Sequence, residues 1–106
     1  MNNSSPKAAH PAEIKKIFIK ARRILKHPGL DILISPTDHA HGILIVVTPG
    51  RIGTAVQRNT IRRRIKALFH EYKLNKTVDC IVIVKKRGVP LTYEELKTII
   101  LPALAH

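Results

Sequence analysis

Residues 43–72 read ILIVVTPGRIGTAVQRNTIRRRIKALFHEY, and this stretch decides the fold. Its first five residues are all aliphatic, which predicts a strand long enough to lie in the middle of a sheet. A loop with two glycines follows at 48–53. Thr54 and Gln57 then have the spacing of a capping box, which predicts a helix that begins there and runs to about residue 72. The stretch is therefore expected to form a strand, a loop and a long helix.

The predicted helix has an apolar face and a cationic face. At about 100° per residue, one stripe collects the large apolar side chains and predicts the side that packs on the sheet; these are Ile61, Ile65, Leu68, Phe69 and Tyr72. The neighbouring stripe holds Asn59, Arg62, Arg63 and Lys66, with Arg64 on the opposite flank. Arg58 falls near the apolar face in the first turn, where we expect it to lean over the edge of the sheet.

The flanking sequence predicts the remaining elements. Pro11 opens a helix that is expected to end near residues 27–29, a His-Pro-Gly sequence; its apolar positions are Ile14, Ile17, Phe18, Ala21 and Leu25. Alternating apolar residues predict a strand at 30–35, and an apolar run predicts another at 79–84. Thr92 and Glu95 form a second capping box, and Pro102 is expected to kink or end the helix that follows. The order α-β-β-α-β-α predicts an α+β fold, a two-layer α/β sandwich with helices covering a small central sheet.

Length and composition indicate one globular domain. The chain has 106 residues, of which 44% are hydrophobic, so we expect a single domain over 10–106 and a flexible N-terminal tail over 1–9. No apolar run reaches the roughly 18 residues of a membrane span, and the N-terminus lacks the pattern of a signal peptide. The single cysteine excludes an intrachain disulfide. We therefore expect a cytoplasmic protein without a membrane partner.

The charge of the chain points to a polyanionic partner. Nineteen Lys and Arg residues stand against seven Asp and Glu residues, which gives a formal net charge of +12. No acidic residue occurs between His39 and His70, although six basic residues lie in that stretch. A solvated helix face is the plain alternative, but such segregation favours a surface that follows phosphates, and so a nucleic acid.

The run Gly53-Thr-Ala-Val-Gln-Arg-Asn-Thr-Ile-Arg-Arg-Arg-Ile-Lys66 resembles the signature of the bacterial ribonuclease P protein family, a Gly-x-Ala-Val-x-Arg-Asn-Arg opening to a basic helix. The apolar strands on either side and the run Leu91-Thr-Tyr-Glu-Glu95 match in order and spacing, so the resemblance covers residues 13–104. It implies a ribosomal-protein-like sandwich with a left-handed β-α-β crossover. It also implies that the chain binds a catalytic RNA, in a ribonucleoprotein endoribonuclease that removes the 5′ leader of precursor tRNA.

The resemblance assigns roles position by position. It places Arg51, Arg58, Asn59, Arg62, Arg63 and Lys66 against the catalytic RNA. Phe18 matches a phenylalanine in a cleft that holds the tRNA leader, although ordinary core packing suits it equally, and Ile14 stands where an aromatic residue is usual. Thr60 replaces the second Arg of the family's Arg-Asn-Arg unit and removes one cation. The implied catalytic centre lies in the RNA, with no catalytic residue, metal or cofactor in the protein alone, and Mg²⁺ is expected with the RNA phosphates.

Two other classes of nucleic-acid-binding protein share some of these features. A structural RNA-binding protein of the ribosomal type shares the basic helix but does not need the signature around it. A DNA-binding helix-turn-helix needs two short helices joined by a tight turn, whereas strands flank the basic helix here, so no DNA partner is expected. His39 and His41 lie beside Asp38 but are read as polar loop residues rather than metal ligands. Cys80 lies in an apolar run and is expected to be a buried packing residue.

Overall fold

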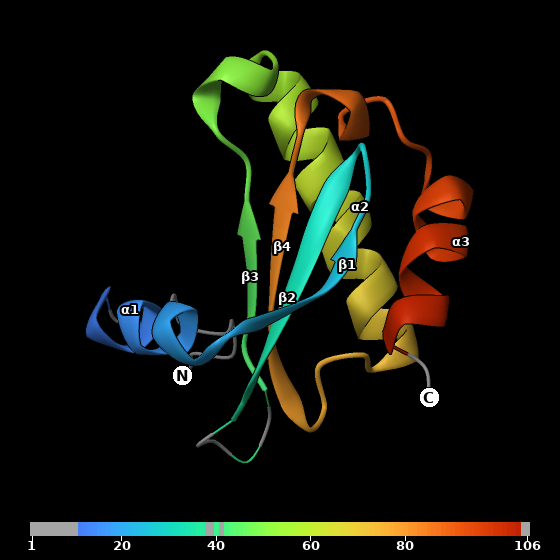
Figure 1. Cartoon of the computed structure of the whole chain (residues 1–106). Coiled ribbons are helices and arrows are strands. Elements are labelled where there is room, and N and C mark those ends of the chain that lie inside the picture. The colour runs from blue at the N-terminus through green and yellow to red at the C-terminus, as the bar shows by residue number, and fades with distance from the viewer. Residues whose placement is uncertain (1–10, 38–39, 41, 105–106) are drawn as a thin grey trace, which may run out of the picture.

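The computed structural model describes residues 11–37, 40 and 42–104. In chain order the elements are α1 (Pro11–Lys20), β1 (Arg22–Lys26), β2 (Leu30–Pro36), β3 (Leu44–Val47), the 3₁₀ turn η1 (Gly50–Ile52), α2 (Ala55–Tyr72), β4 (Val78–Val84), the 3₁₀ turn η2 (Lys86–Gly88) and α3 (Tyr93–Leu104). The described residues thus form an α+β fold of three helices and one mixed sheet (Figure 1). The expected flexible tail over 1–9 lies outside the described residues.

The sheet has the strand order β1-β2-β4-β3. β1 pairs with β2 and β2 with β4 in antiparallel fashion, while β3 and β4 are parallel neighbours. A parallel pair needs a crossover connection, and α2 supplies it between β3 and β4. The left hand of this crossover stays a prediction from the family resemblance.

The expectation that residues 43–47 lie in the middle of the sheet is wrong. β3 covers only Leu44–Val47 and forms an edge, because it pairs with β4 alone. Leu44 and Val46 pack against the core, so the alternate residues Ile45 and Val47 lie on the other face of the sheet. Both faces of β3 therefore carry apolar side chains. This explains the unbroken apolar run without a second neighbouring strand.

The first helix is shorter than expected, and a strand replaces its second half. α1 ends at Lys20, and residues 22–26 form the edge strand β1, so the order is α-β-β-β-α-β-α. The turn after β1 closes a hairpin, in which the amide of His27 donates to the carbonyl of Leu30 (3.0 Å). The backbone hydrogen bonds between β1 and β2 stabilise a strand here, although the spacing of Ala21 and Leu25 favours a helix. A register irregularity between Arg23 and Leu25 is typical of an edge strand.

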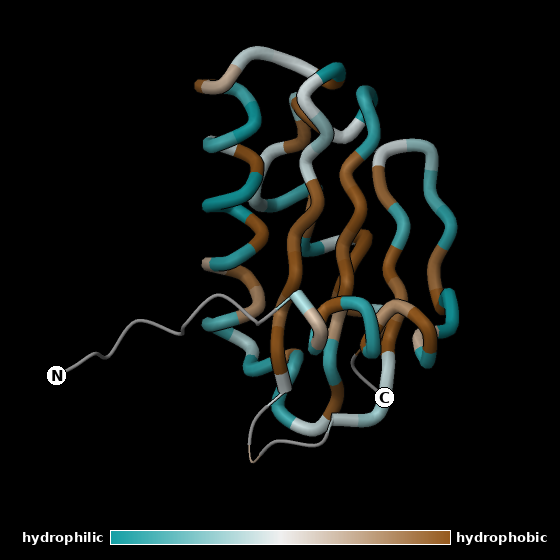
Figure 2. The backbone as a smooth tube through the Cα atoms, turned by 90° about the vertical axis from the view of Figure 1, so that its left-hand side faces the viewer, coloured by the Kyte–Doolittle hydropathy of each residue, from teal (hydrophilic) through white to brown (hydrophobic). Residues whose placement is uncertain are grey.

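The hydrophobic core lies between the sheet and the two helices α2 and α3, which cover the same face (Figure 1). Four of the five residues in the predicted apolar stripe of α2 are buried: Ile61, Ile65, Leu68 and Phe69. The fifth, Tyr72, is exposed, because it is the last residue of the helix. The four buried residues meet buried side chains of β2 and β4 and two residues of α3, which include Leu30, Ile32, Cys80, Val82, Leu96 and Ile100. Figure 2 shows β3 and β4 as mostly hydrophobic, with hydrophilic and hydrophobic residues alternating along α2. The predicted two-layer sandwich is confirmed.

Both predicted capping boxes are present. The Thr54 hydroxyl accepts from the amide of Gln57 (3.1 Å), and the Gln57 side chain accepts from the amide of Thr54 (2.9 Å). Thr92 and Glu95 make the same reciprocal pair, and this holds the pKa of the Glu95 carboxyl below its usual value. α3 runs through Pro102 and ends at Leu104. The caps fix where α2 and α3 begin, and so where their polar faces point.

Candidate nucleic-acid interface

The exposed side of α2 carries the predicted cations. Asn59, Arg63 and Lys66 are exposed, and Arg62 is half-buried beside them. These four residues follow one another along one side of the helix, turned away from the buried stripe; we call them the α2 cationic face. Arg51 is exposed on η1, just before the helix begins. The structure therefore brings five of the six predicted RNA-binding residues to the surface at or near α2.

Arg62 is held in place by two contacts. Its Nη2 donates to the hydroxyl of Thr48, a buried residue directly after β3, and its Nη1 donates to the side-chain oxygen of Asn59 (3.1 Å). The guanidinium therefore ties α2 to the end of β3 while it remains part of the cationic face. A fixed guanidinium loses less conformational entropy on binding a phosphate than a freely rotating one. Sequence reasoning did not identify Thr48, because its role depends on a contact across the fold.

Arg58 is the sixth predicted residue and differs from the others. Its side chain is half-buried, and its Nε is buried without a hydrogen-bond partner among the described residues. This agrees with the expectation that Arg58 falls near the apolar face in the first turn of α2, while its lean over the edge of the sheet stays a prediction. A buried donor without an acceptor is unfavourable, so the site gains if binding supplies one, directly or through water.

The electrostatic setting of the α2 cationic face is uniformly positive. Among the described residues, none of Arg51, Arg58, Arg62, Arg63 and Lys66 forms an ion pair with a carboxylate. Elsewhere among the described residues, an ion pair joins Asp31 on β2 to Lys85, which directly follows β4 (2.8 Å). The charges at α2 are thus available to an external anion.

The face of the sheet opposite α2 carries an apolar patch, and the same face also holds the polar residues Asp31, Ser35 and Asp79. Cα partners on neighbouring strands share a face, and the pairs Leu33–Ile81, Ile45–Ile81 and Val47–Ile83 place five apolar residues together. Ile81 is buried, whereas Leu33, Ile45, Val47 and Ile83 are half-buried. We call these five residues the open sheet face. The sequence signal for two of these residues, Ile45 and Val47, is the unbroken apolar run at 43–47.

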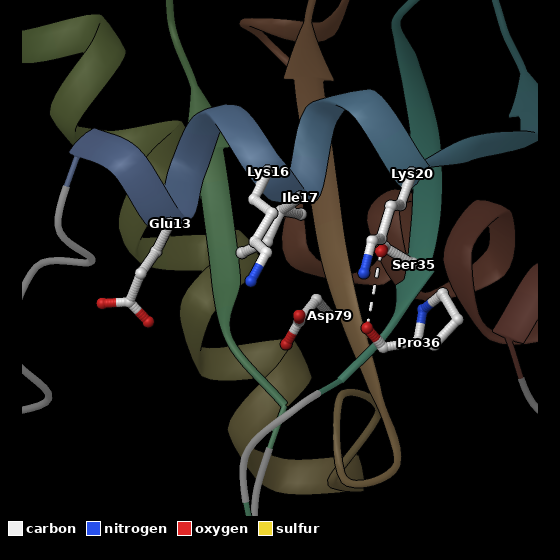
Figure 3. A pocket seen from close by; sticks show the side chains of 7 residues that line it. All are labelled: Glu13, Lys16, Ile17, Lys20, Ser35, Pro36 and Asp79. Carbon is white, nitrogen blue, oxygen red and sulfur yellow. Dashed lines mark hydrogen bonds between the residues drawn. The ribbon is translucent and has the colours of Figure 1, made fainter.

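α1 lies across the end of this same face (Figure 3). Its Ile17 is buried against the sheet, while Phe18 is 40% exposed and Ile14 is half-buried. Ile14 and Phe18 are four residues apart and so share one side of the helix. The structure thus places the two predicted leader-binding residues on the helix that borders the open sheet face, and Phe18 retains exposed ring surface.

A small pocket lies between α1 and the strands below it (Figure 3). It has a volume of about 180 Å³ and is lined by Glu13, Lys16, Ile17, Lys20, Ser35, Pro36 and Asp79. Lys16 and Lys20 point from α1 toward the strands (Figure 3). Asp79 is buried, and its Oδ1 accepts from the amide of Ile43 (2.7 Å), so this carboxylate fixes the start of β3. The pocket thus places two lysines and two carboxylates, Glu13 and Asp79, beside the open sheet face.

The remaining candidate chemistry is structural. Cys80 is buried as expected, and burial, with a smaller contribution from Asp79, raises the pKa of its thiol to about 12. The thiol therefore stays protonated at neutral pH. His39 and His41 lie outside the described residues, and within the described part no group of three or more His, Cys, Asp or Glu side chains is placed to hold a metal ion. No described helix has the length and apolar character to cross a membrane.

Comparisons with known proteins agree with this arrangement. A family model described as Ribonuclease P matches residues 6–106. The ribonuclease P protein component of Bacillus pumilus is 32% identical over 87 residues, covering 80% of this chain and 73% of that protein. That of Borrelia turicatae is 30% identical over 97 residues, covering 89% and 84%. A structure of the RNase P protein from Staphylococcus aureus has the same fold, with a TM-score of 0.79 at 21% identity, covering 92% of this chain and 90% of that one. The chain therefore belongs to the ribonuclease P family of protein components.

Proposed function

We propose that the α2 cationic face, together with Arg51 and Arg58, binds the RNA of ribonuclease P, and that this RNA holds the catalytic centre. The observation that carries the proposal is the set of cations along α2 that have no carboxylate partner among the described residues. Phosphates are the natural ligands for such a row, because each contact releases condensed counterions and so contributes favourably to binding. Arg62, fixed by Thr48, offers its guanidinium in one orientation.

We further propose that the 5′ leader of precursor tRNA lies on the open sheet face, with Phe18 and Ile14 at its border. A single strand needs flat apolar surface for its bases and cations for its backbone. The open sheet face offers the first, and Lys16 and Lys20 on α1 offer the second. The partly exposed ring of Phe18 is suited to stack on a base.

The setting of the reaction follows from this assignment. We propose that Mg²⁺ enters the assembly with the RNA, since hard phosphate oxygens and water are the ligands it prefers. The protein contributes cations that reduce the repulsion between RNA segments and between RNA and precursor tRNA. Its place of action is then the cytoplasm, where precursor tRNA is processed.

The test is binding to a bacterial ribonuclease P RNA at several salt concentrations. The slope of log K against log salt should be about −0.7 to −0.9 for each phosphate contacted, so several contacts give a steep dependence. Arg63→Ala should weaken binding and flatten the slope, whereas Lys76→Ala is the matched control, because Lys76 is an exposed cation in the loop after α2. Affinity that does not change with salt, or equal losses in both variants, would contradict the proposal.

A further inference from the structure

A second cationic surface lies on the other flank of α2. Here η1, the first half of α2 and the turn around η2 enclose an open groove of about 610 Å³. Both 3₁₀ turns lie at the same end of the sheet (Figure 1). We call this the flank groove; its lining includes Arg51, Val56, Thr60, Arg64, Lys86 and Pro90.

Three cations from three separate elements meet in the flank groove. Arg51 comes from η1, Arg64 from α2 and Lys86 from η2, and no carboxylate lines the groove. None of the three forms an ion pair among the described residues. A single solvated lysine would not indicate a binding site. Here Arg51 and Lys86 are 35 residues apart in the sequence, and the fold brings both to one groove.

Arg64 gives the groove a fixed charge. Its Nη1 donates to the carbonyl of Leu91 (2.8 Å), and the side chain is half-buried, so the guanidinium is held at the wall of the groove. Thr60, one turn earlier, turns its hydroxyl back to the carbonyl of Val56 (2.8 Å) and leaves the groove open. Val56 is 74% exposed and adds apolar surface beside the cations. The groove therefore offers positive charge and apolar surface, which match the phosphates and the bases of a nucleotide strand.

The flank groove is separate from the α2 cationic face. Arg64 and Lys66 are two residues apart, which places them about 200° apart around the helix axis, on nearly opposite sides. Arg63 lies about 100° from Arg64, on the exposed side of α2 between the two surfaces. Arg51 lines the flank groove.

We propose that the flank groove binds a second RNA strand through its phosphates, and that Arg64 and Lys86 are its principal contacts. This inference rests on the proposed function, because it takes the RNA partner from there. It adds a surface that clamps α2 between two RNA segments and makes the η2 turn part of the interface.

A tethered cleavage experiment tests this assignment directly. Lys86→Cys would carry an iron chelate that produces hydroxyl radicals, and the protein would be assembled with a bacterial ribonuclease P RNA. The natural Cys80 is buried with a pKa raised to about 12, so it stays unlabelled. Lys76→Cys, on the loop after α2, is the matched control, and Arg63→Cys reports on the α2 cationic face.

The proposal predicts cuts at discrete nucleotides from position 86 that differ from those made from positions 63 and 76. No cuts from position 86, with discrete cuts from position 63, would overturn the flank groove and leave the proposed function standing. No discrete cuts from either position would overturn both. As a second measurement, Lys86→Glu should weaken RNA binding more than Lys76→Glu and reduce the salt slope by about 1, the value for one lost phosphate contact. Equal effects of the two reversals would contradict the proposal.

Discussion

Three consecutive arginines on α2 have three different environments. Arg63 is exposed, Arg62 is bonded to Thr48 at the end of β3, and Arg64 is bonded to the carbonyl of Leu91. The helix turns about 100° between each of them, so neighbouring residues face different parts of the molecule. A run that looks uniform in the sequence therefore divides into one cation without a partner among the described residues and two that also stabilise the fold.

This difference predicts unequal effects of two alanine substitutions. Arg62→Ala removes hydrogen bonds to Thr48 and Asn59 and should lower the free energy of unfolding by about 1–2 kcal/mol, because the Thr48 hydroxyl is left buried without its donor. Arg63→Ala should change it by less than about 0.5 kcal/mol, as at other exposed positions. Both should weaken RNA binding. Denaturant unfolding measures the first effect, and equal stabilities of the two variants would show that Arg62 has no structural role.

A substitution at Phe18 tests the proposed leader site separately from assembly with the RNA. Phe18→Leu keeps most of the apolar volume, so the fold should survive, but it removes a ring that is worth about 1–3 kcal/mol when a base stacks on it. The ratio of precursor to mature tRNA affinity should fall in the assembled enzyme, while binding to the catalytic RNA stays unchanged. If the ratio is unchanged in a folded variant, Phe18 belongs to the core and not to the leader site.

At the scale of the elements, the sequence predicted best where local signals and tertiary contacts agree. α2 was predicted from its capping box to its last turn, because Thr54 fixes its start and the apolar stripe fixes its buried side. The Arg22–Lys26 segment was misassigned, because its helical spacing agrees with α1 while its ladder to β2 is visible only in the fold. The open sheet face could be predicted only in part for the same reason. Which residues share this face depends on the register of three strands, and that register is set by the fold.

The end of α2 offers a test of local strain. Lys73 has φ of 52°, in the left-handed region, and its amide donates to the carbonyl of Phe69. Residues with a Cβ pay roughly 1–2 kcal/mol in this conformation, and glycine does not. Lys73→Gly should therefore raise the melting temperature, whereas Lys76→Gly, a nearby exposed position without positive φ, should not. A lower melting temperature for Lys73→Gly would show that the lysine side chain stabilises the cap more than the strain costs.

At the scale of the whole molecule, the sheet separates two tasks. One face carries the core and α2, whose exposed cations point away from the sheet, and the other face carries the apolar patch bordered by α1. In the proposed function, catalytic RNA and tRNA leader are bound at the same time, because they are assigned to different surfaces. A net charge of +12 suits both proposed partners, since each is a polyanion.

The central claim is that this chain is the working protein subunit of ribonuclease P, and reconstitution tests it most directly. The measurement is the rate of 5′ leader removal from precursor tRNA by a bacterial ribonuclease P RNA at low Mg²⁺, with and without the protein. Cations of the protein replace part of the screening that Mg²⁺ otherwise supplies, so adding the protein should raise the rate strongly, and Arg63→Ala should require a higher protein concentration for the same rate. A folded protein that binds the RNA but leaves the rate unchanged would contradict the claim and favour a structural RNA-binding protein.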